Sequence, residues 1–207
     1  HAMTTLIGIM PGFEQSQITI PSSVKAITGY QAAVVYDTSS NKIVDPSFNN
    51  KQGLILAANQ EIKDLGSVGA FQKLGDFSVQ RIHPQDNPTT MVTAPIMTTP
   101  NVGLKTLTSI QFANNSQLQT IGPKAFAGCT NLTSVSLPDT CNTIGAQAFQ
   151  NCTNLQSINL KGVQYIGDAA FNNAFIASNN AIAVANPVTL NLSSVQYIGT
   201  GAFDSLE

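Results

Sequence analysis

Charged side chains are scarce in this chain of 207 residues: Lys, Arg, Asp and Glu make up 10% of it, and the formal net charge is −2. Proteins that bind DNA or RNA usually present a basic patch. No cluster of Lys and Arg occurs in the sequence, so no nucleic-acid partner is expected. A run of 18 apolar residues is also lacking, so we expect no membrane insertion.

Residues that bind metals or act as nucleophiles are few. The chain has 3 Cys and 2 His, it contains no Cys-x-x-Cys pair, and His83 is the only histidine beyond the first residue. A zinc site needs about four nitrogen or sulfur ligands at short spacing. A Gly-x-Ser-x-Gly elbow is absent, and the acidic residues are scattered singly. We therefore expect no metal, no cofactor and no catalytic residue, and we interpret the chain as a non-enzyme.

The chain does contain a short motif that occurs four times: Ile-Gly, two variable residues, then Ala-Phe. The spacings between its first residues are 144 − 121 = 23, 166 − 144 = 22 and 198 − 166 = 32, counted over Ile121, Ile144, Ile166 and Ile198. A period of about 20 to 29 residues with apolar anchors indicates a stacked solenoid. In each copy we expect the Gly to allow a tight turn and the Phe to fill the interior.

A short strand is predicted in each repeat. In Leu132-Thr-Ser-Val135-Ser-Leu137 the apolar and polar residues alternate, so Val135 and Leu137 share one face and Ser134 and Ser136 the other. One such strand cannot bury enough surface to offset its ordering entropy, but stacked strands share a core. Neighbouring repeats are therefore expected to stabilise one another.

These repeats resemble the BspA-like, or Treponema-type, leucine-rich repeats. The resemblance rests on Leu132-Thr-Ser-Val135-Ser-Leu137-Pro138, on Ile144-Gly-Ala-Gln-Ala148-Phe149 and on Cys152, and it covers residues 104–203. It implies an α/β repeat solenoid, with a parallel β-sheet on the concave face and short helices, 3-10 turns and loops on the convex face. It also implies display on a cell surface for adhesion or partner binding.

Outside residues 104–203 the repeat pattern is weaker, and we divide the chain according to how much of it can be recognised. Residues 1–3 look like an expression scar, and 4–61 are interpreted as degenerate repeats or a cap, with a separate small domain as the rival. Val34-Val35-Tyr36 and Leu54-Ile55-Leu56 predict strands there. Residues 62–103 combine a worn repeat, from Ile62 to Ala70-Phe71, with a Pro/Thr-rich insertion. Regular repeats fill 104–205, so we expect one continuous solenoid that is truncated at its C-terminus.

The cysteines are interpreted as structural. Cys129 and Cys152 occupy the same slot of consecutive repeats, where other copies hold Leu or Ala, so we expect buried packing residues. Cys141 lies in a polar turn and is the more exposed candidate. Whether any pair is oxidised depends on geometry that the sequence does not supply. Asn131 and Asn154 also share a slot, where side-chain amides can satisfy backbone groups.

Two sets of residues are candidates for partner contact. The outward row of the predicted strands, on the concave face, is uncharged and comprises Ser109, Gln111, Ser134, Ser136, Ser157, Asn159, Thr189 and Asn191. Insertions in repeat proteins often lie on a binding face, and the apolar centre of the first insertion comprises Met91, Val92, Ile96 and Met97. Packing against the repeats is the alternative role of this insertion.

Three classes of function follow from these features. The first is an extracellular, cell-surface module that binds a host or neighbouring-cell surface protein, an extracellular matrix protein or a glycan. The second is a structural spacer that displays another domain. The third is a carbohydrate-binding or carbohydrate-active β-solenoid, which would need an acidic cluster in one groove for turnover. The oligomeric state is not indicated by the sequence.

Overall fold

The computed structural model describes residues 4–8, 13–40, 42–45, 54–73, 77–82, 92–97, 101–176 and 188–204. The chain divides into two compact units. Unit 1 comprises His1–Gly29, Gly69–Lys73 and Val102–Glu207, whereas unit 2 comprises Tyr30–Val68 and Leu74–Asn101. These boundaries differ from those expected from the sequence, because unit 2 interrupts unit 1 twice.

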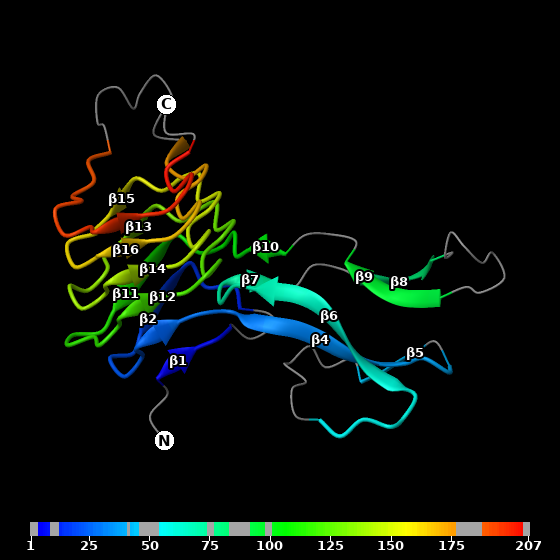
Figure 1. Ribbon diagram of the computed structural model, residues 1–207. Coiled ribbons are helices and arrows are strands. Elements are labelled where there is room, and N and C mark those ends of the chain that lie inside the picture. Colours follow the sequence, from blue (N-terminus) through cyan, green and yellow to red (C-terminus); the bar gives the residue numbers. More distant parts are fainter. Residues whose placement is uncertain are drawn as a thin grey trace. The chain divides into compact units, whose positions relative to one another are not determined.

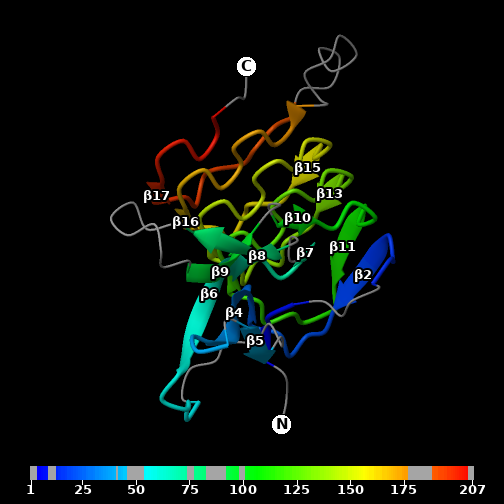
Figure 2. The ribbon, with the colours of Figure 1, turned by 90° about the vertical axis from the view of Figure 1, so that its right-hand side faces the viewer.

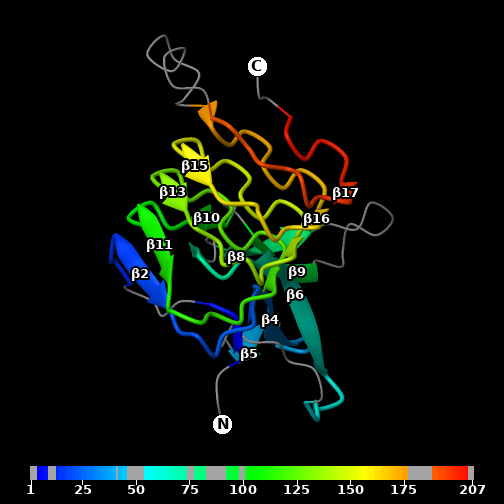
Figure 3. The ribbon, with the colours of Figure 1, turned by 90° about the vertical axis from the view of Figure 1, so that its left-hand side faces the viewer.

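Unit 1 is built around two parallel sheets (Figure 1). The first, here called the isoleucine sheet, contains in spatial order β1 (Thr5–Leu6), β3 (Ala26–Ile27), β12 (Thr120–Ile121), β14 (Thr143–Ile144), β16 (Tyr165–Ile166) and β17 (Tyr197–Ile198). The second, here called the serine sheet, contains β2 (Gln17–Ile20), β11 (Ser109–Phe112), β13 (Ser134–Val135) and β15 (Ser157–Ile158). Figures 2 and 3 show these four strands side by side in that order.

The predicted equivalence of the four isoleucines is confirmed by the strand register. Ile121 pairs with Ile144, Ile144 with Ile166, and Ile166 with Ile198. The first three are 0% exposed, and Ile198 is 47% exposed because β17 is the last strand of its sheet. The sheets therefore place one residue of each repeat in line, as the sequence period predicts.

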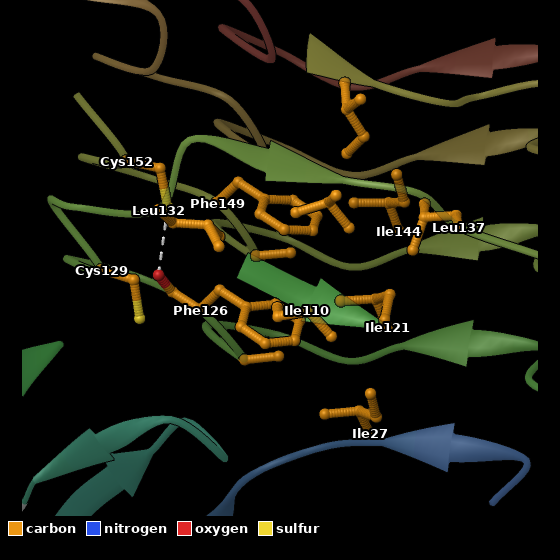
Figure 4. Packing of buried hydrophobic residues seen from close by; sticks show 14 of the residues in the cluster. Ile27, Ile110, Ile121, Phe126, Cys129, Leu132, Leu137, Ile144, Phe149 and Cys152 are labelled. Atoms are coloured by element: carbon orange, nitrogen blue, oxygen red, sulfur yellow. Dashed lines mark hydrogen bonds between the residues drawn. The ribbon is translucent and has the colours of Figure 1, made fainter. Parts of the chain in front are cut away.

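A column of phenylalanine rings runs through the core of the same repeats. Phe126 stacks on Phe149 with ring centroids 5.2 Å apart, and Phe149 stacks on Phe171 at 5.3 Å. The ends of the column are Phe71 and Phe203, which stack on Phe126 and Phe171 respectively. Figure 4 shows Phe126 and Phe149 one above the other, beside the line of Ile27, Ile121 and Ile144.

Backbone hydrogen bonds also connect the turns that carry these rings. The amide of Phe126 donates to the carbonyl of Ala148, and the amide of Phe149 donates to the carbonyl of Ala170, each at 2.8 Å. Phe71 makes the same bond to Ala125. Since buried backbone groups must be paired, this side of the stack is satisfied between repeats although it forms no regular strand.

One repeat is split in the sequence. Ile27 in β3 pairs with Ile121, so it takes the isoleucine position of the repeat that stacks before the one containing Ile121. Its Ala-Phe pair is Ala70-Phe71, both 0% exposed, and residues 30–68 of unit 2 lie between the two pieces. Ile62 belongs to β6 (Gln60–Val68) in unit 2, so the interpretation of Ile62 to Phe71 as one worn repeat is wrong. Residues 74–101 of unit 2 interrupt unit 1 a second time, between Lys73 and Val102. On either side of this interruption, β7 (Gln72–Lys73) pairs antiparallel with β10 (Val102–Gly103).

The expectation of short helices is not borne out. Among the residues that the structure describes, the segments between strands of the repeats are turns, and no α-helix is present. The turn after each isoleucine spans few residues and bonds to the next repeat, so its backbone groups are satisfied without a helix. The repeats of unit 1 are therefore built from parallel strands joined by turns.

The glycine of each Ile-Gly-x-x-Ala-Phe motif does not serve the tight turn that the sequence predicts. Gly122, Gly145 and Gly167 do not have positive φ, so they are not required by turn conformation. A Cβ at Gly145 would lie 2.7 Å from the nitrogen of Pro123, and a Cβ at Gly167 would lie 2.6 Å from the nitrogen of Ala146. The glycine is needed because the preceding repeat passes too close for a side chain.

Left-handed backbone occurs instead two residues later. The second variable position of the motif has positive φ in all four copies: 55° at Lys124, 58° at Gln147, 51° at Ala169 and 61° at Gly201. A side chain in this region is strained, typically by about 1 kcal/mol or more. The repeat imposes this conformation, whichever residue the sequence supplies.

We expect Gln147→Gly to raise the free energy of unfolding slightly, by about 0.5 kcal/mol. The substitution removes the strained Cβ, and the gain is partly offset by the greater entropy of glycine in the unfolded chain. Ala148→Gly, at the next position, is the control and should lower stability by about 1 kcal/mol, because Ala148 is buried and has ordinary φ. Urea denaturation measures both; equal losses would show that position 147 is unstrained.

Unit 2 is antiparallel. Its central strand β4 (Tyr30–Asp37) pairs with β5 (Lys42–Asp45) on one side and with β6 on the other, and β8 (Phe77–Ile82) pairs with β9 (Val92–Met97). The strand predicted at Val34-Val35-Tyr36 is confirmed, whereas Leu54-Ile55-Leu56 forms no strand and Ile55 is fully exposed. A small cluster of Ala32, Val34, Leu65 and Val68 forms the core of the three-stranded sheet.

Candidate partner-binding surface

The outward face of the serine sheet brings together six of the eight residues predicted to contact a partner on the concave face. Inward residues of its strands are buried, with Ile110 at 3%, Val135 at 2% and Ile158 at 7% exposure. The alternation predicted for Val135 and Ser134 is thus confirmed. Ser109 lies opposite Ser134, which lies opposite Ser157, so three repeats present one serine row. Gln111, Ser136 and Asn159 follow two positions later in the same strands or directly after them, and all three are exposed.

Thr189 and Asn191 do not join this sheet. Both are exposed, but the structure places no strand at residues 188–192, and the serine sheet ends at β15. Asn191 instead accepts a hydrogen bond from the amide of Ser193 at 3.0 Å through its side-chain oxygen. An Asn that binds the backbone two residues on favours a turn over an extended strand, which explains the difference.

The insertion residues lie elsewhere. Met91 lies outside the described residues, as does His83. Val92, Ile96 and Met97 belong to β9, which pairs with β8 in unit 2. They therefore belong to a different unit from the serine sheet.

Hydrogen bonds between repeats fix the edges of the serine face. Thr133 Oγ1 donates to the carbonyl of Thr108 at 3.1 Å, and Asn154 Nδ2 donates to the carbonyl of Thr130 at 2.7 Å. The structural role predicted for the slot of Asn154 is confirmed. Asn159 Nδ2 donates to the carbonyl of Leu137 at 3.0 Å, and its Oδ1 accepts from the amide of Lys161. Asn159 therefore holds two repeats together. The exposed hydrogen-bonding side chains left on this face include Gln111, Ser136 and Ser157.

Ser109 is the exception among these serines. Its Oγ is buried and has no hydrogen-bond partner among the described residues. A buried hydroxyl without a partner costs about 1–3 kcal/mol relative to one that is paired. The outward face is uncharged along all four strands, because its residues are Gln, Thr, Ser and Asn.

Sequence reasoning missed a second surface, on the outward face of the isoleucine sheet. Tyr165 and Tyr197 are directly paired in β16 and β17, and their rings stack with centroids 4.7 Å apart and planes 6° apart. They are 42% and 48% exposed. The signal was present as Val-Gln-Tyr-Ile-Gly, written at residues 163–167 and again at 195–199. A tyrosine one position before an inward isoleucine must point outward.

The cysteines do not contribute to either surface. Cys129, Cys141 and Cys152 are free thiols that are each 0% exposed, so the expectation that Cys141 is the more exposed is wrong. Burial raises the pKa of Cys129 and of Cys141 to about 12, and it raises the pKa of Cys152 as well. Cys152 Sγ donates to the carbonyl of Phe126 at 3.2 Å, drawn as a dashed line in Figure 4. A protonated thiol is a poor nucleophile, so these residues act in packing.

Within the described part of the chain, no group of three or more His, Cys, Asp or Glu residues could hold a metal ion. Across the same residues, the structure contains no helix of the length and apolar character that a membrane crossing requires.

The family described as BspA type leucine rich repeat region matches residues 102–207 in six copies. No curated protein and no solved structure matches the chain.

Proposed function

The chain belongs to the BspA-type leucine-rich repeat family, and from this premise we propose that it is a non-catalytic binding or adhesion module of a cell-surface protein. Domains of this family are generally surface modules for protein interaction and are generally non-catalytic. The proposal places the chain outside the cell and assigns partner recognition to the outward face of the serine sheet. It also takes the stacked repeats to form a solenoid with this sheet on its concave side.

The observation that carries the proposal is the register of the serine sheet. Ser134 and Ser157 are directly paired and neither side chain is buried, so hydroxyl groups recur at the spacing of adjacent parallel strands, about 4.8 Å. Bonds between repeats hold this row in place before any partner arrives. A preorganised surface loses little entropy on binding.

The chemistry of the face indicates how it would bind. It has no aromatic or Arg side chain to serve as an anchor, and such anchors dominate tight protein interfaces. Each contact is therefore weak, and useful affinity comes from several repeats that engage one partner together. We propose an extracellular matrix protein or a host-cell surface protein as this partner.

The test is a paired substitution on the serine face. We expect Ser136→Arg with Ser157→Arg to lower affinity for the partner at least about tenfold, because two long cationic side chains cover a neutral face. Both serines are exposed, so the melting temperature should stay close to that of the parent. The partner is found first by probing an array of matrix proteins and surface ectodomains with the chain.

Gln117→Arg is the matched control, since Gln117 is exposed but lies in the connection between β11 and β12. It should leave binding unchanged. Undiminished binding by the doubly substituted chain would reject the serine face as the contact surface. An array that stays silent would favour the role of a spacer that displays another domain.

A further inference from the structure

Side chains of different length lie next to each other on the outward face of the isoleucine sheet and form a step. Thr120, Thr143 and Tyr165 are consecutive partners across β12, β14 and β16. The residues after them, Ile121, Ile144 and Ile166, are 0% exposed and point into the core, so the threonines and tyrosine point out. The outward side chains are therefore short threonines on β12 and β14, and a longer aromatic ring on β16.

Among the described residues, one aromatic ring stacks on Tyr165. Tyr197 stacks on the side of the following repeat, at 4.7 Å. On the opposite side the neighbouring strand supplies Thr143, whose side chain is shorter than the ring. Tyr165 is 42% exposed, and we infer that the outer part of this ring face contributes to that exposure.

An exposed side-chain amide precedes each residue of this row in the chain. The residue before each outward position is Gln119, Asn142, Gln164 or Gln196, and all four are exposed. Their backbone is fixed: the carbonyl of Asn142, for example, accepts hydrogen bonds from the amides of both Gln164 and Tyr165. Thr143 Oγ1 donates to Asn142 Oδ1 at 2.8 Å, which places the amide of the exposed Asn142 beside Thr143.

We propose that Tyr165, Thr143, Thr120, Asn142 and Gln119, here called the tyrosine notch, bind a neutral glycan. A sugar ring combines an apolar C–H face with a rim of hydroxyl groups. The open face of Tyr165 matches the first, and the amides and threonine hydroxyls match the second. None of the five residues is charged, so the notch offers nothing to a sulfated or sialylated chain.

An extended polypeptide fits this surface less well. Peptides that add to a sheet bind its edge, where backbone groups are free. The notch lies on a sheet face, where the backbone groups of β12, β14 and β16 already bond to their neighbours. The proposal goes beyond the function proposed above, because it uses a different sheet and a different ligand class, and either can fail without the other.

The probe is an array of neutral hexose and N-acetylhexosamine oligosaccharides printed beside sialylated and sulfated ones. We expect the intact chain to retain neutral oligosaccharides, and we expect Tyr165→Ala to lower the affinity for the best of them at least about tenfold in calorimetry. Tyr165→Phe keeps the ring face and should change affinity less than about twofold. Thr143→Arg, which keeps the ring but fills the notch, should abolish binding.

Gln156→Arg is the control and should bind the glycan as the parent does, because Gln156 is exposed and directly precedes β15 of the serine sheet. Thermal melting checks that each variant is folded, and Thr143→Arg keeps the test decisive if Tyr165→Ala unfolds. Failure to retain any neutral glycan at millimolar concentration, a preference for charged glycans, or unchanged binding by both notch variants would overturn the proposal. So would a glycan-silent chain whose binding to a protein, or to a second copy of itself, is lost in Tyr165→Ala.

Discussion

Phe149→Ala is expected to lower the free energy of unfolding by about 3–5 kcal/mol, which is the range for a large aromatic residue removed from a core. Phe149 is 0% exposed and lies between two rings, Phe126 at 5.2 Å and Phe171 at 5.3 Å. The substitution therefore leaves a cavity and breaks two stacking contacts at once. Urea denaturation followed by circular dichroism measures the loss.

Gln147→Ala is the control for this prediction. Gln147 is half-buried, lies in the same turn and is not a member of the core cluster, so the change should cost less than about 0.5 kcal/mol. Similar stability of the two variants would show that the phenylalanine column does not hold the repeats together. A loss confined to the last repeats would show that they unfold independently of the first.

Gly145→Ala is the second substitution for which a large effect is expected, although it adds only one methyl group. The new Cβ would lie 2.7 Å from the nitrogen of Pro123 and 2.8 Å from the carbonyl carbon of Gly122. Both atoms belong to the backbone of the preceding repeat, which cannot rotate away as a side chain can. We expect a loss of about 3 kcal/mol or more, measured by urea denaturation.

The comparison with Gln147→Gly separates two explanations of the glycine. If Gly145 served the turn, an alanine there would cost only the strain of left-handed backbone, yet Gly145 does not have positive φ. Two residues later Gln147 does have it, and losing its Cβ should help. Opposite signs at the two positions support close packing of the repeats, whereas a neutral Gly145→Ala would contradict it.

Function was less accessible from the sequence than fold. The serine row could be predicted because a strand of period two fixes which side chains face out. The tyrosine notch could not be assembled in the same way, because it depends on the height difference between Thr143 and Tyr165 across adjacent strands. That difference becomes a feature only when the two repeats are placed in register.

The sequence by itself determined the repeat unit of this protein, because the inward positions recur at a regular spacing and only apolar residues suit them. It therefore indicated the family, the aligned isoleucines and the inward phenylalanines. Only the tertiary structure decided that Ile27 and Phe71 belong to one repeat and that residues 30–68 form part of another unit. The physical reason is that pairing between β3 and β12 and stacking of Phe71 on Phe126 join residues that are far apart in the chain, so no local pattern can record them.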